Sequence, residues 1–196
     1  MEFRFDGPGA MIEFIEKLPE GLTAALTSDH AAIDGEPQVM KFVLTGVKLT
    51  LDSGELAYTA CLDHDIFNRI RTDLEGQEGT LYITADRVHW MNGEKGLGLS
   101  FDMPSIVMHA LQNPKKDQGK DEWEVLAMVD GGQLLMPDGT KLLEESIDLE
   151  DYDEEIDCYT WNLWFSVGPK AVADSIDKVL NECSPDSGAF SDEEDF

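Results

Sequence analysis

GTLYITADRVHWMNGEKGLGLSFDMPSIVMHAL, residues 79–111, is the stretch that decides the fold of this chain. An apolar run around Tyr82 leads through a short turn to Trp90. A glycine-rich turn follows, apolar residues then alternate up to Phe101, and Pro104 opens another alternating run. Alternating runs separated by turn residues are typical of antiparallel strands. The stretch therefore predicts a β-meander with three turns.

Further strand patterns flank the meander on both sides. Residues 39–50 alternate but contain Gly46, which predicts two short strands broken near that glycine. The other candidate strands are 56–62, 123–129, 134–136 and 158–167. Residues 12–18 are expected to form one short amphipathic turn, and residues 66–74 fit no single pattern. Taken together, these patterns indicate a mainly β domain.

The last ordered element is predicted to be a helix. Gly168–Pro169 marks its start, because proline is favoured in the first turn of a helix. Apolar residues recur at helical spacing on one stripe and the helix ends near Cys183: the stripe holds Val172, Ile176, Val179 and Leu180. The residues alone thus predict antiparallel β-structure with one capping helix.

Charge is the most unusual feature of the composition. The 196 residues include 41 acidic and 14 basic residues, which gives a net charge of −27. Such a chain repels nucleic-acid phosphates and anionic lipid, and its natural partners are basic surfaces. The three cysteines are Cys61, Cys158 and Cys183, which are far apart and form no C-x-x-C pair. We therefore expect free thiols in a reducing compartment. The sequence holds no apolar run long enough to span a membrane.

The acidic residues concentrate in one segment and in the tail. Residues 144–157 read EESIDLEDYDEEID, and we expect a solvated, mobile loop because no packed face tolerates that density of charge. Its acidic residues are Glu144, Glu145, Asp148, Glu150, Asp151, Asp153, Glu154, Glu155 and Asp157. We expect 12–183 to be one domain that contains an N-terminal insertion at about 12–75 and the acidic loop 144–157. Residues 184–196 are expected to be a disordered acidic tail, and residues 1–11 are expected to be a leader added for expression.

The meander resembles one family, the ICln proteins, which are described as methylosome subunits and as chloride conductance regulatory proteins. Their pattern is a GTLYI strand, Arg and Trp in the next strand, a G-L-G turn, a strand containing Ser and Phe, and a proline before I-x-x-H-A-L. The matching positions are Gly79–Ile83, Arg87, Trp90, Gly96–Gly98, Ser100–Phe101, Pro104 and Ile106–Leu111. The resemblance continues to the acidic tail, and it is poor before Gly76.

The resemblance implies a pleckstrin-homology-like fold of two antiparallel sheets capped by the C-terminal helix. It also implies a cytosolic, and in part nuclear, chaperone for Sm proteins in spliceosomal snRNP assembly. Such a protein would pair strand edges with basic Sm partners, keep RNA out, and present the Sm proteins to an arginine methyltransferase. The acidic segment would then compete with RNA, whereas without the resemblance it is only a solvated loop. The alternative is a regulator of a swelling-activated chloride current at the membrane.

No catalytic, cofactor or metal pattern is present in the sequence, so we expect a protein that is not an enzyme. His64 lacks a second cluster of ligands, and His89 and His109 are expected to be structural or surface residues. The only basic cluster is Lys115, Lys116 and Lys120, which is too small to favour phosphoinositide binding against the net charge.

Three further residues are candidates for contact or control. All four tryptophans are expected in or half in the core. Trp164 alternates with Trp161, Leu163 and Phe165, so it is a candidate either for a contact surface or for packing under the helix. Phe190 lies in a segment that loosely resembles the motif by which family members dock on the methyltransferase. Ser191 is followed at once by Asp192, Glu193 and Glu194 in an acidic run that ends at Asp195, the context of an acid-directed kinase site.

Overall fold

The fold is described from a computed structural model. The described residues are 12–19, 22, 39–52, 68, 71–114, 116, 119, 121–130, 134–138 and 160–183. The predicted strand 56–62 and the acidic segment 144–157 therefore lie outside the described residues.

The described part of the chain is mainly β. Its strands are β1 (Ile12–Ile15), β2 (Met40–Asp52), β3 (Glu78–Thr84), β4 (Arg87–Asn92), β5 (Leu97–Asp102), β6 (Ile106–Gln112), β7 (Trp123–Asp130), β8 (Leu134–Leu135) and β9 (Thr160–Gly168). A short 3-10 helix, η1 (Met103–Ser105), joins β5 to β6, and the helix α3 (Lys170–Cys183) follows β9. The predicted meander is confirmed for β3, β4 and β5, which pair in sequence. The last strand of the stretch, β6, forms as predicted but leaves the meander, because after η1 it pairs with β7 at the other end of the sheet.

The strands form one curled sheet in the order β6-β7-β9-β2-β3-β4-β5-β1-β8. Every neighbouring pair is antiparallel except β1 and β8, which run parallel. The long strand β2 makes the continuity possible, because its first part pairs with β3 and its last part also pairs with β9. The sheet is therefore continuous, where the family resemblance led us to expect two sheets.

Two local predictions were wrong. The two strands predicted within 39–50 are one strand, β2, because the register shift between Thr45 and Val47 absorbs Gly46 (φ 73°) as a bulge instead of a break. Residues 12–15 form strand β1 and not an amphipathic turn. Ile12 and Phe14 point into the core at 1% and 2% exposure, the period-2 pattern of a strand.

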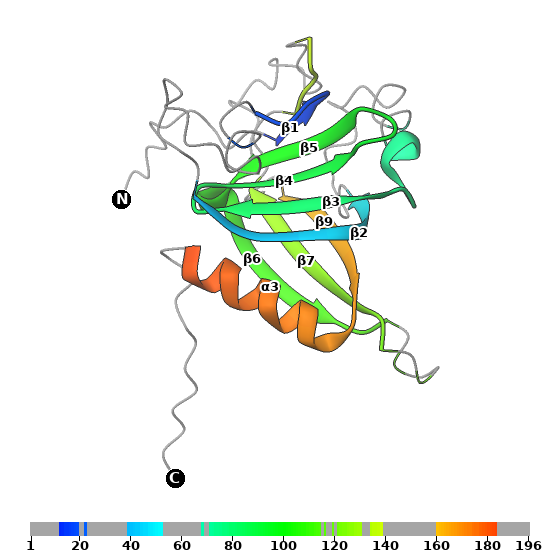
Figure 1. The fold of residues 1–196 in the computed structure, drawn as a ribbon, viewed down its shortest axis with the longest axis vertical. Helices are drawn as coiled ribbons and strands as arrows, with labels where there is room; N and C mark the ends of the chain where they lie inside the picture. The colour runs from blue at the N-terminus through cyan, green and yellow to red at the C-terminus, as the bar shows by residue number, and fades with distance from the viewer. Residues whose placement is uncertain are drawn as a thin grey trace, which may run out of the picture.

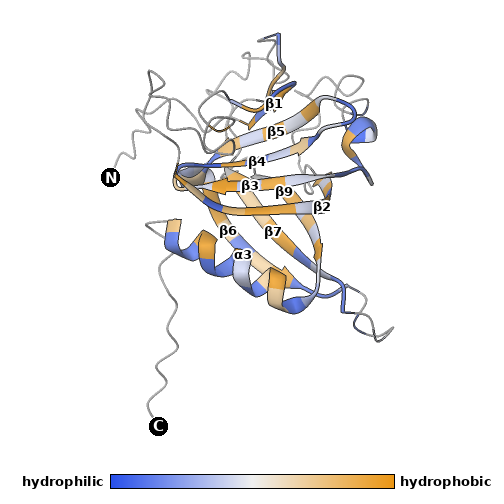
Figure 2. Ribbon diagram, in the orientation of Figure 1, coloured by the Kyte–Doolittle hydropathy of each residue, from blue (hydrophilic) through white to orange (hydrophobic). Residues whose placement is uncertain are grey.

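The helix α3 lies across the open side of the curled sheet, against β6, β7 and β9 (Figure 1). Its apolar stripe and polar face are separated along its length in Figure 2. Ile176 and Leu180 are buried, whereas Val172 and Val179 are partly buried against the same core. The carboxylate of Asp121 accepts a hydrogen bond from the Lys170 backbone N–H at 3.3 Å and so caps the helix start. The predicted helix and its stripe are confirmed.

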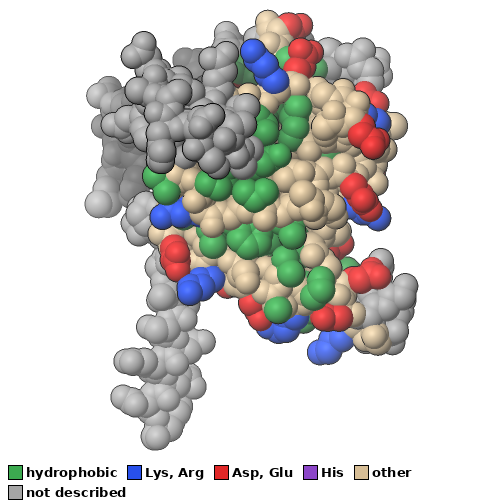
Figure 3. Space-filling view, in the orientation of Figure 1, with side chains coloured by type: hydrophobic (Ala, Val, Ile, Leu, Met, Phe, Trp, Pro, Cys, Tyr) green, Lys and Arg blue, Asp and Glu red, His purple; other side chains and the backbone are tan. Residues whose placement is uncertain are grey.

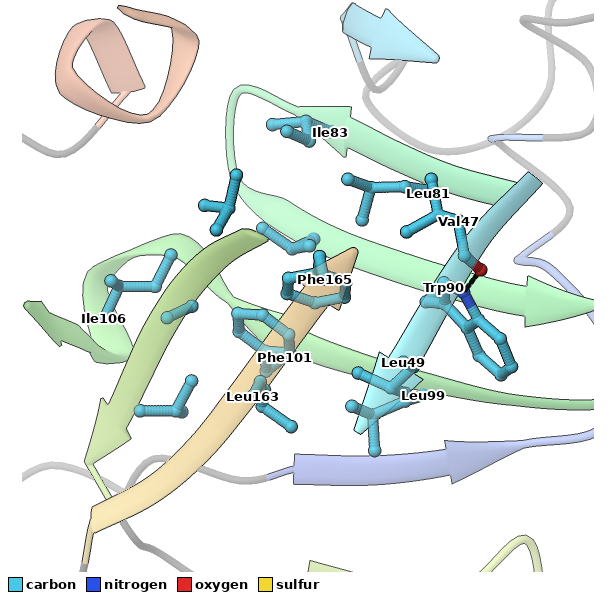
Figure 4. Packing of buried hydrophobic residues seen from close by; sticks show 14 of the residues in the cluster. Val47, Leu49, Leu81, Ile83, Trp90, Leu99, Phe101, Ile106, Leu163 and Phe165 are labelled. Carbon is cyan, nitrogen blue, oxygen red and sulfur yellow. Dashed lines mark hydrogen bonds between the residues drawn. The ribbon is translucent and has the colours of Figure 1, made fainter. Parts of the chain in front are cut away.

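Trp90 is the centre of the packing that the quoted stretch encodes. Its indole N–H donates to the Val47 carbonyl at 2.9 Å, as the dashed line in Figure 4 marks. A Cβ at Gly79 would lie 2.5 Å from the Trp90 ring, and one at Gly98 would lie 2.5 Å from the Trp90 carbonyl oxygen. Glycine is therefore required on both sides of the tryptophan, which explains why the two glycines and the tryptophan occur together.

Candidate functional site

The candidate site is the free edge of β6. This strand ends the sheet, and it pairs with β7 on one side while no other strand of the described residues pairs with its second side. An unpaired edge presents backbone N–H and C=O groups that can pair with another chain. Val107 and Met108 lie at its start and are 55% and 48% exposed, which places apolar surface beside the open backbone.

The composition of β6 leaves this edge unprotected. Its seven residues IVMHALQ include no Asp, Glu, Lys, Arg or Pro. Natural edge strands are usually blunted by charge, proline or shortness, and β6 uses none of these along its length. A register shift between Ile106 and Met108 leaves a bulge at Val107, so the regular part of the free edge runs from Met108 to Gln112.

The helix α3 packs against strand β6 and fixes its position. The imidazole Nε2 of His109 lies 3.3 Å from the Asp177 carboxylate on α3, and the His109 side chain is only 8% exposed. Leu111 packs against the core from the same side of the strand. The edge is thus held at a set distance from α3, which favours binding of an extended segment without rearrangement.

The face of the sheet away from the core is also partly apolar next to the β6 edge. Ala110 pairs with Leu126 on β7, and Leu126 pairs with Trp164 on β9, which forms one row across three strands. Trp164 is half-buried and faces away from its core neighbours Trp161 and Leu163, as its alternation predicted. Sequence reasoning therefore placed Trp164 on the correct face, and the register adds that it lies two strands from the free edge.

A second exposed apolar surface lies at β2, in the interior of the strand order. Val39, just before β2, and Val43, within it, are 57% and 42% exposed. In Figure 3 apolar side chains gather over β2 and β3 and above α3, with acidic and basic side chains around them. Because β3 already pairs with Val43, this surface provides side-chain contacts more than free backbone.

His89 is structural, one of the two alternatives that the sequence left open. It is 0% exposed, and neither ring nitrogen has a hydrogen-bond partner. Burial, with the nearby Arg87 charge as the lesser cause, lowers the pKa of His89 to about 4. Arg87 itself lies 3.1 Å from the Glu13 carboxylate and 3.2 Å from that of Asp102. The imidazole is therefore neutral at neutral pH.

Most of the other candidate residues lie outside the described part of the chain. These are the nine acidic residues of 144–157, Phe190, Ser191, and Lys115 and Lys120 of the basic cluster. Within the described residues there is no group of three or more His, Cys, Asp or Glu side chains that could hold a metal ion. Burial raises the pKa of the Cys183 thiol, which keeps it protonated and weakly reactive.

Sequence reasoning missed Val107 and Met108. The available signal was two adjacent large apolar residues in an alternating run, because one of them must then face away from the core. Which strand would be left at the end of the sheet was not readable from the local pattern.

The comparison with known families supports the resemblance of the quoted stretch. The family model for Voldacs, regulators of volume decrease after cellular swelling, matches residues 79–194. The chain belongs to this family. It is the ICln family that the sequence resembles, and the match begins at the glycine where the resemblance becomes strong.

The other comparisons add little to this. No curated protein sequence matches the chain significantly. One chain of the solved structure described as "The 8S snRNP Assembly Intermediate" is similar with a TM-score of 0.43 and 16% identity, over 81% of this chain and 93% of that one. This likeness is too slight to define a fold or a function. Of the helices in the described residues, none has the length and apolar character needed to cross a membrane.

Proposed function

We propose that this member of the ICln family is a chaperone that holds Sm proteins by adding one of their strands to the free edge of β6. The observation that carries the proposal is an uncharged, seven-residue edge strand with exposed Val107 and Met108 at the end of the sheet. Backbone pairing at such an edge supplies affinity, and pockets for alternate side chains supply specificity. The curled sheet and its C-terminal helix support a pleckstrin-homology-like domain as the scaffold.

Charge supports a basic partner. A protein of net charge −27 attracts basic proteins over long range and raises their rate of association. The same charge repels RNA phosphates, so a bound Sm protein would be kept from RNA. In this proposal the acidic segment 144–157 supplies charge for competition with RNA, and Trp164 supplies an apolar contact behind the edge.

The proposal extends to a cytosolic and nuclear role without enzymatic activity. The bound Sm proteins would be presented to an arginine methyltransferase, with Phe190 as the docking residue and Ser191 as the site where a phosphate would change the local charge. Neither step needs a cofactor, and neither needs direct contact with nucleic acid or insertion into a membrane.

A second candidate function comes from the family description, which is regulation of volume decrease after cellular swelling. A chain with this charge would then act on a membrane protein, because anionic lipid repels it. Co-purification from native extract separates the two functions. Recovery of Sm proteins with a methyltransferase favours the chaperone, and recovery of membrane proteins favours the regulator of volume.

The direct test of the β6 edge is binding of a purified Sm heterodimer to the full-length protein and to two matched variants. Met108→Lys places a positive charge at the free edge, whereas Val43→Lys places the same charge on a similarly exposed residue of β2. We expect Met108→Lys to weaken binding at least tenfold and Val43→Lys to leave it nearly unchanged. Binding should also weaken as salt rises from 50 to 500 mM.

The outcomes separate the parts of the proposal. Equal loss of affinity in both variants would refute the assignment of the binding site to β6. It would show that added positive charge weakens binding wherever it is placed. Absence of binding by the unmodified protein at low salt would refute the Sm chaperone function itself.

A further inference from the structure

The two ends of the sheet differ, and the end opposite β6 is closed by the chain itself. Strand β5 would be the second free edge, but β1 pairs along it in antiparallel register from Ile12↔Phe101 to Ile15↔Gly98. Strand β8 then pairs with the outer side of β1. Figure 1 shows β1 lying beside β5 at the far side of the sheet from β6.

The contacts of β1 are those of a segment built into the domain. Ile12 and Phe14 are 1% and 2% exposed and belong to the same core as Leu99 and Phe101. On the outer face the Glu13 carboxylate lies 3.1 Å from the Arg87 guanidinium, which ties β1 to β4 across β5. Two alternate apolar anchors and one charged residue between them therefore fix the register of the segment.

Among the described strands, β8 ends this side of the sheet, and it is itself poor at pairing. Strand β8 has only two residues, Leu134 and Leu135, and Pro137 follows almost at once. Short strands and proline are two of the ways in which natural proteins block addition to an edge. Strand β6 has seven residues, and its nearest prolines, Pro104 and Pro114, lie outside it as Pro137 lies outside β8. Strand length is therefore the difference between the two ends.

From this asymmetry we infer that the edge of β5 is a second strand-accepting site. It is specific for an extended segment with bulky apolar residues at alternate positions. Strand β1 occupies this site within the same chain. Among the described strands, β6 is then the one whose long edge stays open to a foreign strand. The domain ends an array of strand-paired partners instead of continuing it. Each chain would therefore bind one partner by strand addition. This consequence rests on the proposed function, whereas the assignment of the β5 site does not.

The test uses the full-length protein and a labelled peptide, MIEFIEK, which corresponds to residues 11–17. A double variant, Ile12→Asp with Phe14→Asp, removes both apolar anchors and opens the β5 edge. We expect the peptide to bind this variant at least tenfold more tightly than it binds the unmodified protein. A peptide carrying the same two aspartates should not bind, and Lys17→Asp, an exposed change outside β1, should behave as the unmodified protein does.

Two results would overturn the inference. One is a double variant that keeps its folded circular-dichroism spectrum and does not bind the peptide. The other is equal binding of the peptide to the unmodified protein, which would show that β1 leaves the edge open.

Hydrogen exchange of the unmodified protein decides the case where the double variant fails to fold. The amides of β5 should exchange as slowly as those of β4, which is paired on both sides. Exchange at β5 more than tenfold faster than at β4 would refute closure by β1. None of these measurements contains an Sm protein, so failure of the chaperone proposal and failure of this inference are distinguishable.

Discussion

The pH dependence of stability tests whether His89 is buried as a neutral side chain. The imidazole is 0% exposed and has no hydrogen-bond partner at either nitrogen. Burial, and to a smaller extent the charge of Arg87, lowers its pKa from 6.5 to about 4. Between those two values the unfolded chain binds a proton at His89 and the folded chain does not.

The free energy of unfolding therefore falls as the pH falls through this interval and is unaffected by His89 above it. A difference of one pKa unit is worth about 1.4 kcal/mol, so the full shift corresponds to about 3 kcal/mol. About 2 kcal/mol of this is lost by pH 5. That pH lies above the isoelectric point of about 4.1, so the protein is still negatively charged during the measurement.

The assay is urea unfolding of the unmodified protein and of His89→Gln at pH 7.5 and pH 5.0. Glutamine does not titrate, so the difference between the two proteins cancels the contribution of the carboxylates. Between pH 7.5 and pH 5.0 we expect the unmodified protein to lose about 2 kcal/mol of unfolding free energy relative to His89→Gln.

The control is Ser100→Ala. Ser100 is paired with His89 across β4 and β5, is 1% exposed and has no hydrogen-bond partner for its hydroxyl. Its removal should change stability equally at both pH values. The contrary result is that His89→Gln and the unmodified protein differ in free energy of unfolding by the same amount at both pH values. That result would refute the assignment of His89 as a buried neutral imidazole.

Three further predictions concern packing and docking. Gly79→Ala should destabilise the fold by about 1–3 kcal/mol, because its Cβ would overlap the Trp90 ring, whereas Gly93→Ala, with nothing within 4 Å, should be nearly neutral in thermal unfolding. Ile176→Asp should abolish cooperative unfolding, since it buries a charge in the core, and a native melting curve would exclude α3 from that core. Phe190→Ala should lose the methyltransferase in pull-downs while Sm binding persists, and equal recovery of the methyltransferase would place its docking site elsewhere.

The sequence predicted the elements whose signals are local. The meander has alternation and turn residues at each end, and α3 has an apolar stripe bounded by Pro169 and Cys183. The set Ile12, Phe14 and Ile15 was ambiguous, because so short an apolar run fits both the strand period and a helical turn. The neighbouring strand β5 settled the choice, and that neighbour is not visible in the local pattern.

The site was less predictable because pairing order is a property of the whole chain. The exposure of Val107 and Met108 depends on which strand ends the sheet, and only the complete order of pairing decides that. The burial of His89 was hidden for a related reason. It follows Val88 in an alternating strand, a pattern that predicts the face on which a side chain lies but not whether that face is covered.

The family pattern in this chain supplies the open end of the sheet and one residue that holds the closed end. Arg87 contacts Asp102 on β5 and Glu13 on β1, so it ties the closed end together. The run Ile106–Leu111 forms the open end, only a 3-10 helix away from β5 along the chain. Between the two ends Trp90 requires glycine on either side, which fixes how β3, β4 and β5 pack. The matched residues thus provide the open edge and the scaffold, and β1, which lies outside the match, closes the other edge. One closed and one open edge among the described strands are the requirement for strand addition at a single place.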